Sequence, residues 1–384
     1  MTLDAAADDF LEQCARCIVN GEAAPAWPDG LSGVGGENAV QDRIAFHGIA
    51  LLLVEHPSLL DDWPENLLSV TRSEARMQGM WEISHAQAVA TLFEALHDAG
   101  ITAIAMKGTA LAYSLYDDPA IRRRGDTDIL IHTHNRDNVR RVMREAGFSP
   151  GGDPLALQEE WFFHTGINFN HEIDVHWRIN ASQALSRALE HDPASQRAID
   201  LPRLSKNAKG MSVLDSILHT CVNRAAHHAY GYPVEDKKLM EGDRLIWAID
   251  LDKLASASSA SDWKRLVEMC ERSGLSGLVR DGLHFAQSKL ETAIPAGVMD
   301  SLASHQSDEP AAQYFDVPSG RKRLMLDLAS CATLRDKAQL IRYALLPGRD
   351  FFAHHMDDHA RYSLAALRAK RLANGALKLI AGRS

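Results

Sequence analysis

The hydrophobic pattern of this chain changes at residue 101, and the change limits the folds that the chain can adopt. Before that point apolar residues follow helical spacing, whereas short apolar runs bounded by turn residues come after it. The expected elements are a strand at Ile101–Met106, a helix at Ala110–Tyr116, a strand at Ile129-Leu130-Ile131, an amphipathic helix at Asn135–Ala146, and strands at Trp161–Asn168 and Glu172–Trp177 joined by a tight turn at Asn170-His171. This order is typical of a small α/β or α+β unit.

Helical periodicity is found on both sides of this unit. The expected helices are Leu3–Val19, Arg72–His97, Ser212–Ala229, Asp236–Leu254, Asp262–Arg272, Ser276–Leu290 and Ala360–Ile380. Gly21–Glu37 and Ser304–Gly320 contain proline and glycine and are expected to be loops. We therefore expect an α+β protein with an N-terminal helical segment at 1–83, a core at 84–180 and a larger all-helical domain at 181–384.

Composition excludes several classes of protein. The chain is 46% hydrophobic and 24% charged, with a formal net charge of −10, so it is not a disordered chain, a collagen or a disulfide scaffold. The acidic balance disfavours a nucleic-acid partner. The longest apolar run, Ile49–Val54, is far shorter than the roughly 20 residues that span a membrane. Five cysteines and an acidic N-terminus lead us to expect a soluble, cytoplasmic protein.

Acidic residues are concentrated near two of the expected strands. Side chains alternate between the two faces of a strand, so Asp126 and Asp128 point the same way, with Cα atoms about 7 Å apart. By the same alternation Glu172, Asp174 and His176 share one face. If the two strands are neighbours, Asp174 completes a cluster of three carboxylates, and a divalent cation is the common reason for such a cluster. The pattern predicts one or two Mg²⁺ ions that bind a nucleoside triphosphate.

A second group of residues predicts phosphate binding. Lys107-Gly108-Thr109 comes at a strand end just before a helix, where backbone N–H groups and a glycine favour a bound phosphate. Arg122, Arg123 and Arg124 offer further positive charge. We expect one of these arginines, Arg123, to bind phosphate and the other two to be solvated. Cationic side chains, an anion-binding turn and a carboxylate cluster together indicate phosphoryl or nucleotidyl transfer.

These motifs resemble those of the nucleotidyltransferases of the DNA polymerase β superfamily. The resemblance rests on Lys107-Gly108-Thr109, on Gly125-Asp126-Thr127-Asp128-Ile129-Leu130-Ile131 and on Ile173-Asp174-Val175-His176-Trp177, which occur in the order expected for that superfamily. Within it, the chain is most similar to the uncharacterised bacterial nucleotidyltransferase family. Lys107-Gly108 departs from the usual Gly-Ser form of the superfamily, but is like that closer family. His219, Arg244, Trp247 and Asp250 are similar to the helical portion of the same family.

The resemblance implies a mixed sheet with helices, of the polymerase β type, and it implies roles for particular residues. Asp126 and Asp128 would ligate the metal ions, and Asp174 would bind the second metal or activate the acceptor hydroxyl. The residues implied in nucleotide binding are Lys107, Gly108, Thr109, Arg123 and Gly125. The reaction would be Mg²⁺-dependent transfer of an NMP group from an NTP to a hydroxyl or phosphate acceptor, with Mn²⁺ as an alternative ion. The acceptor would be a small molecule, a peptide or a protein.

Other interpretations stay open at this level. The core could bind nucleotide as a regulatory module without catalysis, or transfer a sugar from a nucleotide sugar. Lys107 could be an ordinary surface lysine, and His176 could pack beside Trp177. Cys14 and Cys17 form a lone CxxC pair, which lacks the further ligands that zinc needs. His355 and His359 stand four residues apart, but they too lack a third ligand, so a solvated helix is the expectation there.

Overall fold

The structure is a computed structural model of the 384-residue chain. It describes residues 2–151, 158–166, 169–180, 182–186, 189–234, 237–239, 242–304, 309–316, 320–331, 333–348, 352 and 361–380. Within these residues a mixed β-sheet is surrounded by many helices, which confirms the expected α+β fold class.

The strand that carries the paired aspartates lies in the middle of the sheet. The strands described in this sheet are β1 (Ala103–Ala105), β2 (Asp126–Ile131), β3 (Ser149–Pro150), β4 (Gln158–His164), β5 (Asn170–His176), β6 (Ile199–Asp200) and β7 (Lys209–Gly210). Their order is β3-β4-β5-β2-β1-β7-β6. β2 pairs in parallel with β5 and antiparallel with β1, while β4 pairs antiparallel with β5. A separate hairpin pairs β8 (Tyr232–Val234) with β9 (Lys237–Leu239).

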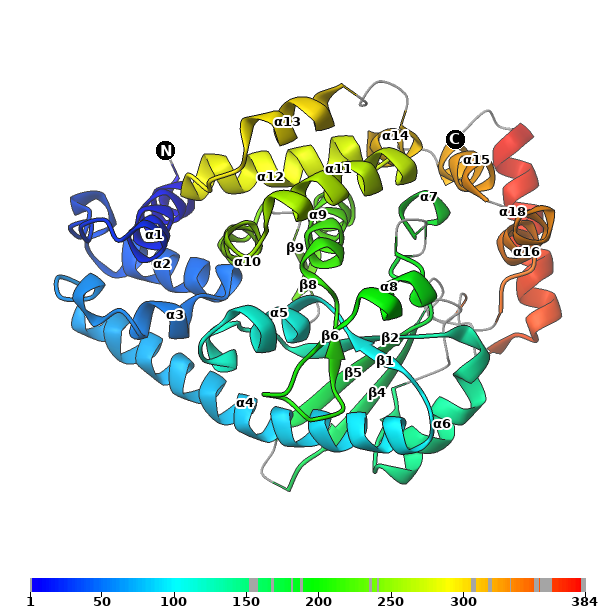
Figure 1. The fold of residues 1–384 in the computed structure, drawn as a ribbon, viewed down its shortest axis with the longest axis horizontal. Helices are drawn as coiled ribbons and strands as arrows, with labels where there is room; N and C mark the ends of the chain where they lie inside the picture. Colours follow the sequence, from blue (N-terminus) through cyan, green and yellow to red (C-terminus); the bar gives the residue numbers. More distant parts are fainter. Residues whose placement is uncertain are drawn as a thin grey trace.

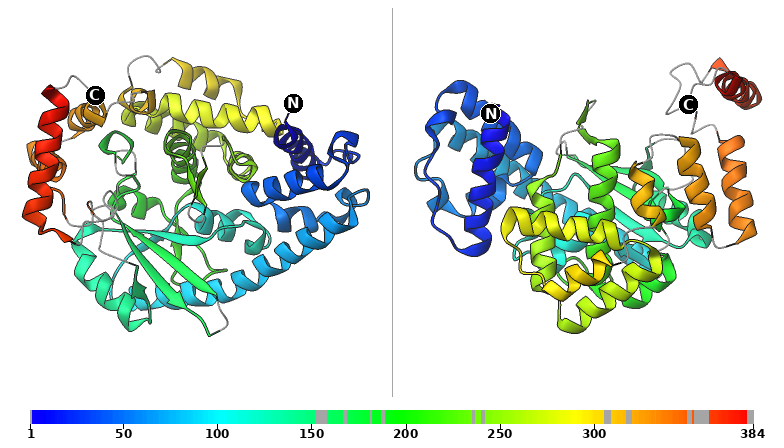
Figure 2. Two further views of the ribbon diagram at one scale, coloured as in Figure 1. Left: turned by 180° about the vertical axis from the view of Figure 1, so that it is seen from behind. Right: turned by 90° about the horizontal axis from the view of Figure 1, so that it is seen from above.

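Helices lie below, above and at both ends of the sheet in Figure 1. The α-helices are α1 (Leu3–Asn20), α2 (Val34–His47), α3 (Ala50–Val54), α4 (Glu65–Asp98), α5 (Lys107–Leu115), α6 (Arg136–Glu145), α7 (Gln183–Ser186), α8 (His191–Arg197), α9 (Val213–Tyr230), α10 (Leu245–Ser256), α11 (Ala260–Ser273), α12 (Ser276–Leu290), α13 (Ala296–Ala303), α14 (Pro310–Asp316), α15 (Gly320–Ser330), α16 (Leu334–Leu345) and α18 (Leu364–Ile380). Figures 1 and 2 place α1–α3 and the C-terminal helices α15, α16 and α18 at opposite ends of the molecule.

The helix α4 covers one face of the sheet. Its buried side chains recur every three or four residues, as at Val89, Leu92, Phe93 and Leu96, so one side of the helix faces the core. The helix stops next to Gly100, whose φ of +71° is one that glycine adopts readily. Figure 1 shows α4 running beneath the sheet.

The two faces of the sheet belong to two different hydrophobic cores. Ala105 and Ile129 pack with apolar residues of α4, α5 and α6. On the other face, Ile104 and Leu130 pack with apolar residues of the N-terminal and C-terminal helices. Asp128 shares its face with Leu130 because strand side chains alternate. The acidic face of the sheet is therefore the one that the N- and C-terminal helical segments cover.

The structure corrects the expected boundaries of two elements near the site. Asn170 and His171 belong to β5 and not to the turn, because the backbone N–H of Thr165 donates to the carbonyl of Phe169 at 3.0 Å and closes the chain reversal earlier. The helix expected from Ala110 starts at Lys107, so the whole Lys-Gly-Thr turn forms its first turn.

Two further corrections concern the C-terminal part of the chain. Residues 237–239 form a strand inside the helix that we expected over Asp236–Leu254, and α10 begins only at Leu245. Residues 310–316 form α14 inside an expected loop. A three-residue strand and a seven-residue helix are too short to give a clear periodic signal, which is why sequence analysis missed them.

Some expectations are not tested by the fold. The division at 1–83, 84–180 and 181–384 stays a prediction; α4 runs continuously through residue 83, and β6 and β7 join the sheet from beyond residue 180. His355 and His359 lie outside the described residues. Among the residues that are described, no helix is long and apolar enough to cross a membrane.

Candidate active site

Carboxylates from three adjacent strands meet on one face of the sheet. In the parallel pairing of β2 with β5, Asp126 stands opposite Glu172 and Asp128 stands opposite Asp174. The two strands are therefore neighbours, which was the condition for Asp174 to join the two aspartates of β2. The antiparallel pairing of β5 with β4 places Glu160 opposite Asp174 on the other side. One row across the sheet thus holds Asp128, Asp174 and Glu160.

Asp128 is the most enclosed acid of this cluster, with a relative exposure of 2%. The ammonium group of Lys107 donates to its Oδ1 atom, and His176 Nε2–H donates to the same oxygen at 2.7 Å. Burial opposes ionisation of Asp128, but Lys107 and His176 outweigh it and hold the pKa of Asp128 well below its ordinary value. Asp128 is therefore a fixed negative charge at the centre of the site. His176 is a hydrogen-bond partner of this acid, a role beyond packing beside Trp177.

The two carboxylate oxygens of Asp174 differ in their hydrogen bonding. Its Oδ2 atom accepts a hydrogen bond from Gln158 at 3.2 Å, whereas its buried Oδ1 atom has no hydrogen-bond partner among the described residues. Burial and the neighbouring carboxylates of Asp128 and Asp126 raise the pKa of Asp174 to about 8. A buried carboxylate oxygen without a donor is costly unless a cation or a proton satisfies it.

Two overlapping groups of side chains could hold a metal ion. The first is Asp128, Asp174 and His176, and the second is Glu160, Glu172 and Asp174; in each group the ligand atoms lie within 4.8 Å of one another. Burial, with Asp126 and Glu160 next to it, raises the pKa of Glu172 to about 7. Oxygen-rich donor sets of this kind suit Mg²⁺ or Mn²⁺. The donor set and the unpartnered Asp174 oxygen therefore fit a divalent cation.

The first turn of α5 lies beside the acids. Lys107 has a φ of +46°, in the left-handed region that favours glycine, and Glu291 is the one other non-glycine residue like it in the described chain. An added Cβ at Gly108 would come within 3.2 Å of the Arg124 side chain, so a glycine fits this crowded place. Unpaired N–H groups of a first helical turn can receive a phosphate. By contrast, a Cβ at Gly125 would meet no atom within 4 Å.

The hydroxyl of Thr109 points away from the acids. It lies 2.8 Å from the hydroxyl of Thr127, whose side chain is on the opposite face of β2 from Asp126 and Asp128. Thr127 in turn lies 2.6 Å from His85 Nε2 of α4, and His85 is hydrogen-bonded to His171 of β5. These four side chains, with Ser84 on His171, form a buried polar chain that connects α4, β5, β2 and α5. Thr109 is thus left with its backbone N–H as a phosphate donor.

All three arginines before β2 are engaged in ion pairs. Arg122 makes a buried bidentate contact with Asp250 of α10, and Arg124 is buried against Glu82 of α4. The expectation that these two are solvated is therefore wrong, because both are neutralised by acids distant in sequence. Arg123 is the most exposed of the three, with 37% of its side chain exposed, and it contacts Glu74 of α4.

The helix α9 supplies two histidines that sequence analysis did not place in the site. His219 is buried, and burial together with the nearby Lys107 lowers its pKa to about 3. His227 stacks on Trp247 with ring centroids 5.4 Å apart, and burial lowers its pKa to about 4. Both imidazoles are therefore neutral near pH 7, and the charges of Lys107 and Asp128 act on both of them. Glu160, Glu172 and Gln158 were likewise not predicted as site residues.

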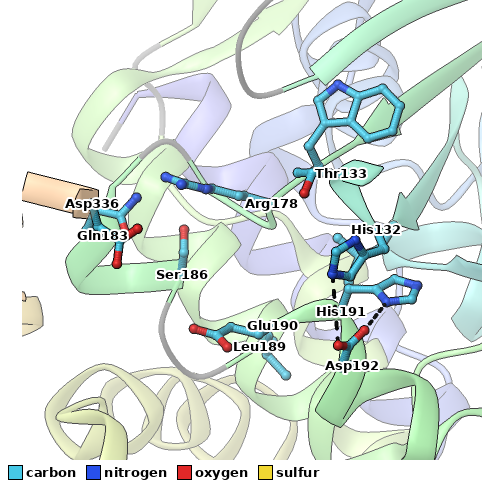
Figure 3. Close-up of a pocket in the computed structure, with 12 residues that line it drawn as sticks. His132, Thr133, Arg178, Gln183, Ser186, Leu189, Glu190, His191, Asp192 and Asp336 are labelled. Atoms are coloured by element: carbon cyan, nitrogen blue, oxygen red, sulfur yellow. Dashed lines mark hydrogen bonds and ion pairs between the residues drawn. The ribbon is translucent and has the colours of Figure 1, made fainter. Parts of the chain in front are cut away.

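A cavity of about 240 Å³ lies at the C-terminal ends of β2 and β5. β2 and β5 run parallel, and both lead from the acids toward residues that line the cavity, including Leu130, His132 and Arg178. Leu130, which lines the cavity, stands opposite His176 in the strand register and two residues after Asp128 in β2. Figure 3 shows His132 and His191 on either side of Asp192 at one side of the cavity, and Arg178 extending toward Asp336 at the other.

Comparison with known proteins identifies the family. A mixed sheet with paired aspartates beside a helical first turn defines the class of nucleotidyltransferase-like proteins, and the sequence model of a family described as uncharacterised nucleotidyltransferase matches residues 37–291. This match covers more than half of the chain, so the chain belongs to that family. Membership of this family supports nucleotidyl transfer as the general class of activity. No curated protein and no solved structure matches the chain significantly.

Proposed function

We propose that the protein transfers an NMP group from a metal-bound NTP to a hydroxyl or phosphate acceptor. The observation that carries this proposal is the row of acids across β2 and β5, with Asp128 and Asp174 in direct register next to the first turn of α5. This arrangement would put a bound cation and a bound phosphate next to each other. Family membership supports the same class of reaction.

Different residues of the site would bind the metal ion and the triphosphate. Asp126, Asp128 and Asp174 would hold Mg²⁺ or Mn²⁺, which when bound supplies positive charge to the phosphate oxygens. The backbone N–H groups of Gly108 and Thr109 would bind the triphosphate at the first turn of α5. The side chains of Lys107 and Arg123 would supply further positive charge for the nucleotide. A bond would form between the acceptor oxygen and the α-phosphorus, and pyrophosphate would leave.

We also propose that the cavity next to His176 receives the acceptor. The triphosphate would occupy the side of the acids where α5 begins, and the cavity opens further along β2 and β5, beyond the opposite side of Asp128. Donor and acceptor would then approach the acids from different sides, as in-line displacement requires. Asp174 would either complete the metal site or take the proton that the acceptor hydroxyl loses. The mixture of Arg178, histidines and acids in the lining fits a polar small molecule or a peptide side chain.

Thermal unfolding with added nucleotide tests the proposed function. The protein is titrated with ATP, CTP, GTP and UTP, each in Mg²⁺ and in EDTA. A ligand that binds the native state adds RT ln(1 + [L]/Kd), roughly 2.7 kcal/mol at a hundredfold excess over Kd. We expect a rise in the unfolding temperature that needs Mg²⁺ and identifies the preferred donor. An unchanged unfolding temperature with all four nucleotides would contradict the proposal.

A nucleotide sugar in the same titration separates the alternatives. If a UDP-sugar stabilises the protein and nucleoside diphosphate is released during turnover, the transferred group is a sugar. If an NTP stabilises it and pyrophosphate is released, the transferred group is a nucleotide. Binding without either product, over a broad set of acceptors, would indicate a nucleotide-binding module.

A further inference from the structure

Lys107 stands where its backbone conformation favours glycine. Its φ of +46° places a side-chain-bearing residue in the left-handed region, which costs free energy that a glycine would not incur. In return the chain gains a cation within the acid cluster, because the ammonium group donates to Asp128 Oδ1. The lysine side chain is 29% exposed, so this is a contact at the edge of the site that solvent and ligands can reach.

The ammonium group is paired with Asp128, one of the three proposed metal ligands. Burial opposes the charge of Lys107, but Asp128, Asp126 and Asp174 outweigh burial and raise the pKa of the lysine above its ordinary value. Asp128 Oδ1 accepts from both Lys107 and His176, so this oxygen is already occupied. Asp174 Oδ1 is a buried oxygen of the cluster that has no hydrogen-bond partner among the described residues, and Asp174 belongs to β5, which lies on the other side of β2 from β1.

We propose that the acid cluster binds one divalent cation, and that the ammonium group of Lys107 holds the position of a second one. This inference rests on the proposed function, because it assigns the metal content of the same site. Paired catalytic metals lie about 3.5–4 Å apart and share a carboxylate. An ammonium group on that shared carboxylate repels a second divalent ion and supplies one positive charge in its place. The one cation then binds between Asp128 and Asp174.

Counting bound Mn²⁺ in the nucleotide-free protein tests this inference without any measurement of activity. The protein is titrated to saturation with Mn²⁺, and free and bound ions are distinguished by electron paramagnetic resonance. We expect one bound Mn²⁺ per chain with the spectrum of an isolated ion. Two Mn²⁺ ions within about 4 Å would instead couple magnetically and broaden the spectrum.

Two variants at the same position separate the charge of Lys107 from its backbone. Lys107→Met removes the charge and keeps the side chain and the left-handed conformation, whereas Lys107→Gly removes the charge and relieves the conformation. We expect both variants to bind two Mn²⁺ ions with a coupled spectrum. Lys206→Met, at an exposed lysine outside the site, is the matched control and should still bind one ion.

The outcomes distinguish this inference from the proposed function. Two coupled Mn²⁺ ions in the unchanged protein would overturn the inference and leave the proposed metal site standing. A count that stays at one in both Lys107→Met and Lys107→Gly would also overturn it, because Lys107 would then exclude nothing. No bound Mn²⁺ in any of the proteins would overturn both the inference and the proposed metal site.

Discussion

His176 and Lys107 donate to the same oxygen of Asp128, the former at 2.7 Å from β5 and the latter from the first turn of α5. Asp128 is therefore held from two elements at once, and its carboxylate cannot rotate without losing one of the two contacts. This relationship links the strand that carries Asp174 to the turn that would bind phosphate. It also makes Asp128 the first position at which to test the site.

Asp128→Asn should abolish metal-dependent transfer while the protein stays folded. The amide keeps the shape of the side chain but removes the negative charge that a metal ligand needs. Changes to residues that merely support metal ligands typically cost about 10- to 100-fold, so the loss of a direct ligand should cost at least about 100-fold in activity. Pyrophosphate release is the measurement. Asp137→Asn, at an exposed aspartate of α6, is the matched control, and equal activity in the two variants would contradict the assignment.

Asp250→Ala should destabilise the protein far more than Glu74→Ala. Asp250 is fully buried and binds both Arg122 and Tyr116, so its removal leaves a buried guanidinium without its partner. Such a loss typically costs about 3–5 kcal/mol. Glu74 belongs to a partly exposed pair, for which about 1 kcal/mol or less is expected. Urea unfolding of both variants gives the comparison, and similar losses would show that burial does not set the strength of these pairs.

Arg123→Ala should weaken NTP binding, whereas Glu74→Ala should not. Both changes remove the ion pair between Arg123 and Glu74, but only the first removes the guanidinium. A hydrogen bond to a charged group contributes about 1.5–3 kcal/mol, so Arg123→Ala should raise Kd by roughly 10- to 100-fold. Calorimetric titration with the preferred NTP measures this. If both variants bind like the unchanged protein, Arg123 serves only to attach the loop to α4.

Thr127→Val should break the buried polar chain behind the acids. Valine has the shape of threonine, but leaves His85 Nε2 and the hydroxyl of Thr109 without their shared partner. An unsatisfied buried polar group costs about 1–3 kcal/mol, and the free energy of unfolding should fall by about that amount. Thr127→Ser keeps the hydroxyl and should lose less. Urea unfolding compares the free energies of unfolding of the two variants. A valine variant as stable as the serine variant would argue against the buried polar chain.

The pH dependence of stability should contain a contribution from His47. Its Nε2–H donates to Asp8 at 2.8 Å and its Nδ1 accepts from the backbone N–H of Leu245 at 3.1 Å, so the folded protein holds the neutral ring. Burial, with Arg43 and Arg244 nearby, lowers the pKa of His47 below 6.5 although Asp8 opposes this. The unfolded chain therefore takes up a proton first, and stability that is present above pH 6.5 is lost as the pH falls below it.

A His47→Gln variant isolates that contribution. Glutamine offers a donor and an acceptor but does not titrate. The loss for a single histidine is at most about 1.4 kcal/mol per pH unit, and the variant should show a shallower decline than the unchanged protein between pH 6.5 and 5. Urea unfolding at several pH values measures both slopes. Parallel profiles would mean that His47 takes up its proton equally in the folded and unfolded states.

Sequence alone predicted the parts of the site that depend on strand alternation. Asp126 and Asp128 share a face, as do Asp174 and His176, because the side-chain period of a strand does not depend on the rest of the fold. The cluster also depended on the pairing of β2 with β5, which the sequence left as a condition and the structure contains. The roles of these acids in catalysis stay a prediction.

Other parts of the site depend on the tertiary structure and could not be read from the sequence. Glu160 joins the acids only because β4 starts at Gln158 and pairs in one particular register with β5. The partners of Arg122 and Arg124 are acids more than 40 residues away along the chain. The early start of α5 requires a lysine in a conformation that lysine rarely adopts, so propensity argues against it.

The buried contact of Asp250 with Arg122 and Tyr116 has a consequence for how the parts of the molecule move. Arg122 lies a few residues before Asp126, and Tyr116 directly follows α5, so α10 is attached to both segments that frame the acids. A displacement of α10 would be transmitted to the start of β2 and to α5 together. Anything that binds α9 or α12, which pack on α10, and shifts α10 thus has a direct mechanical connection to the geometry of the carboxylates.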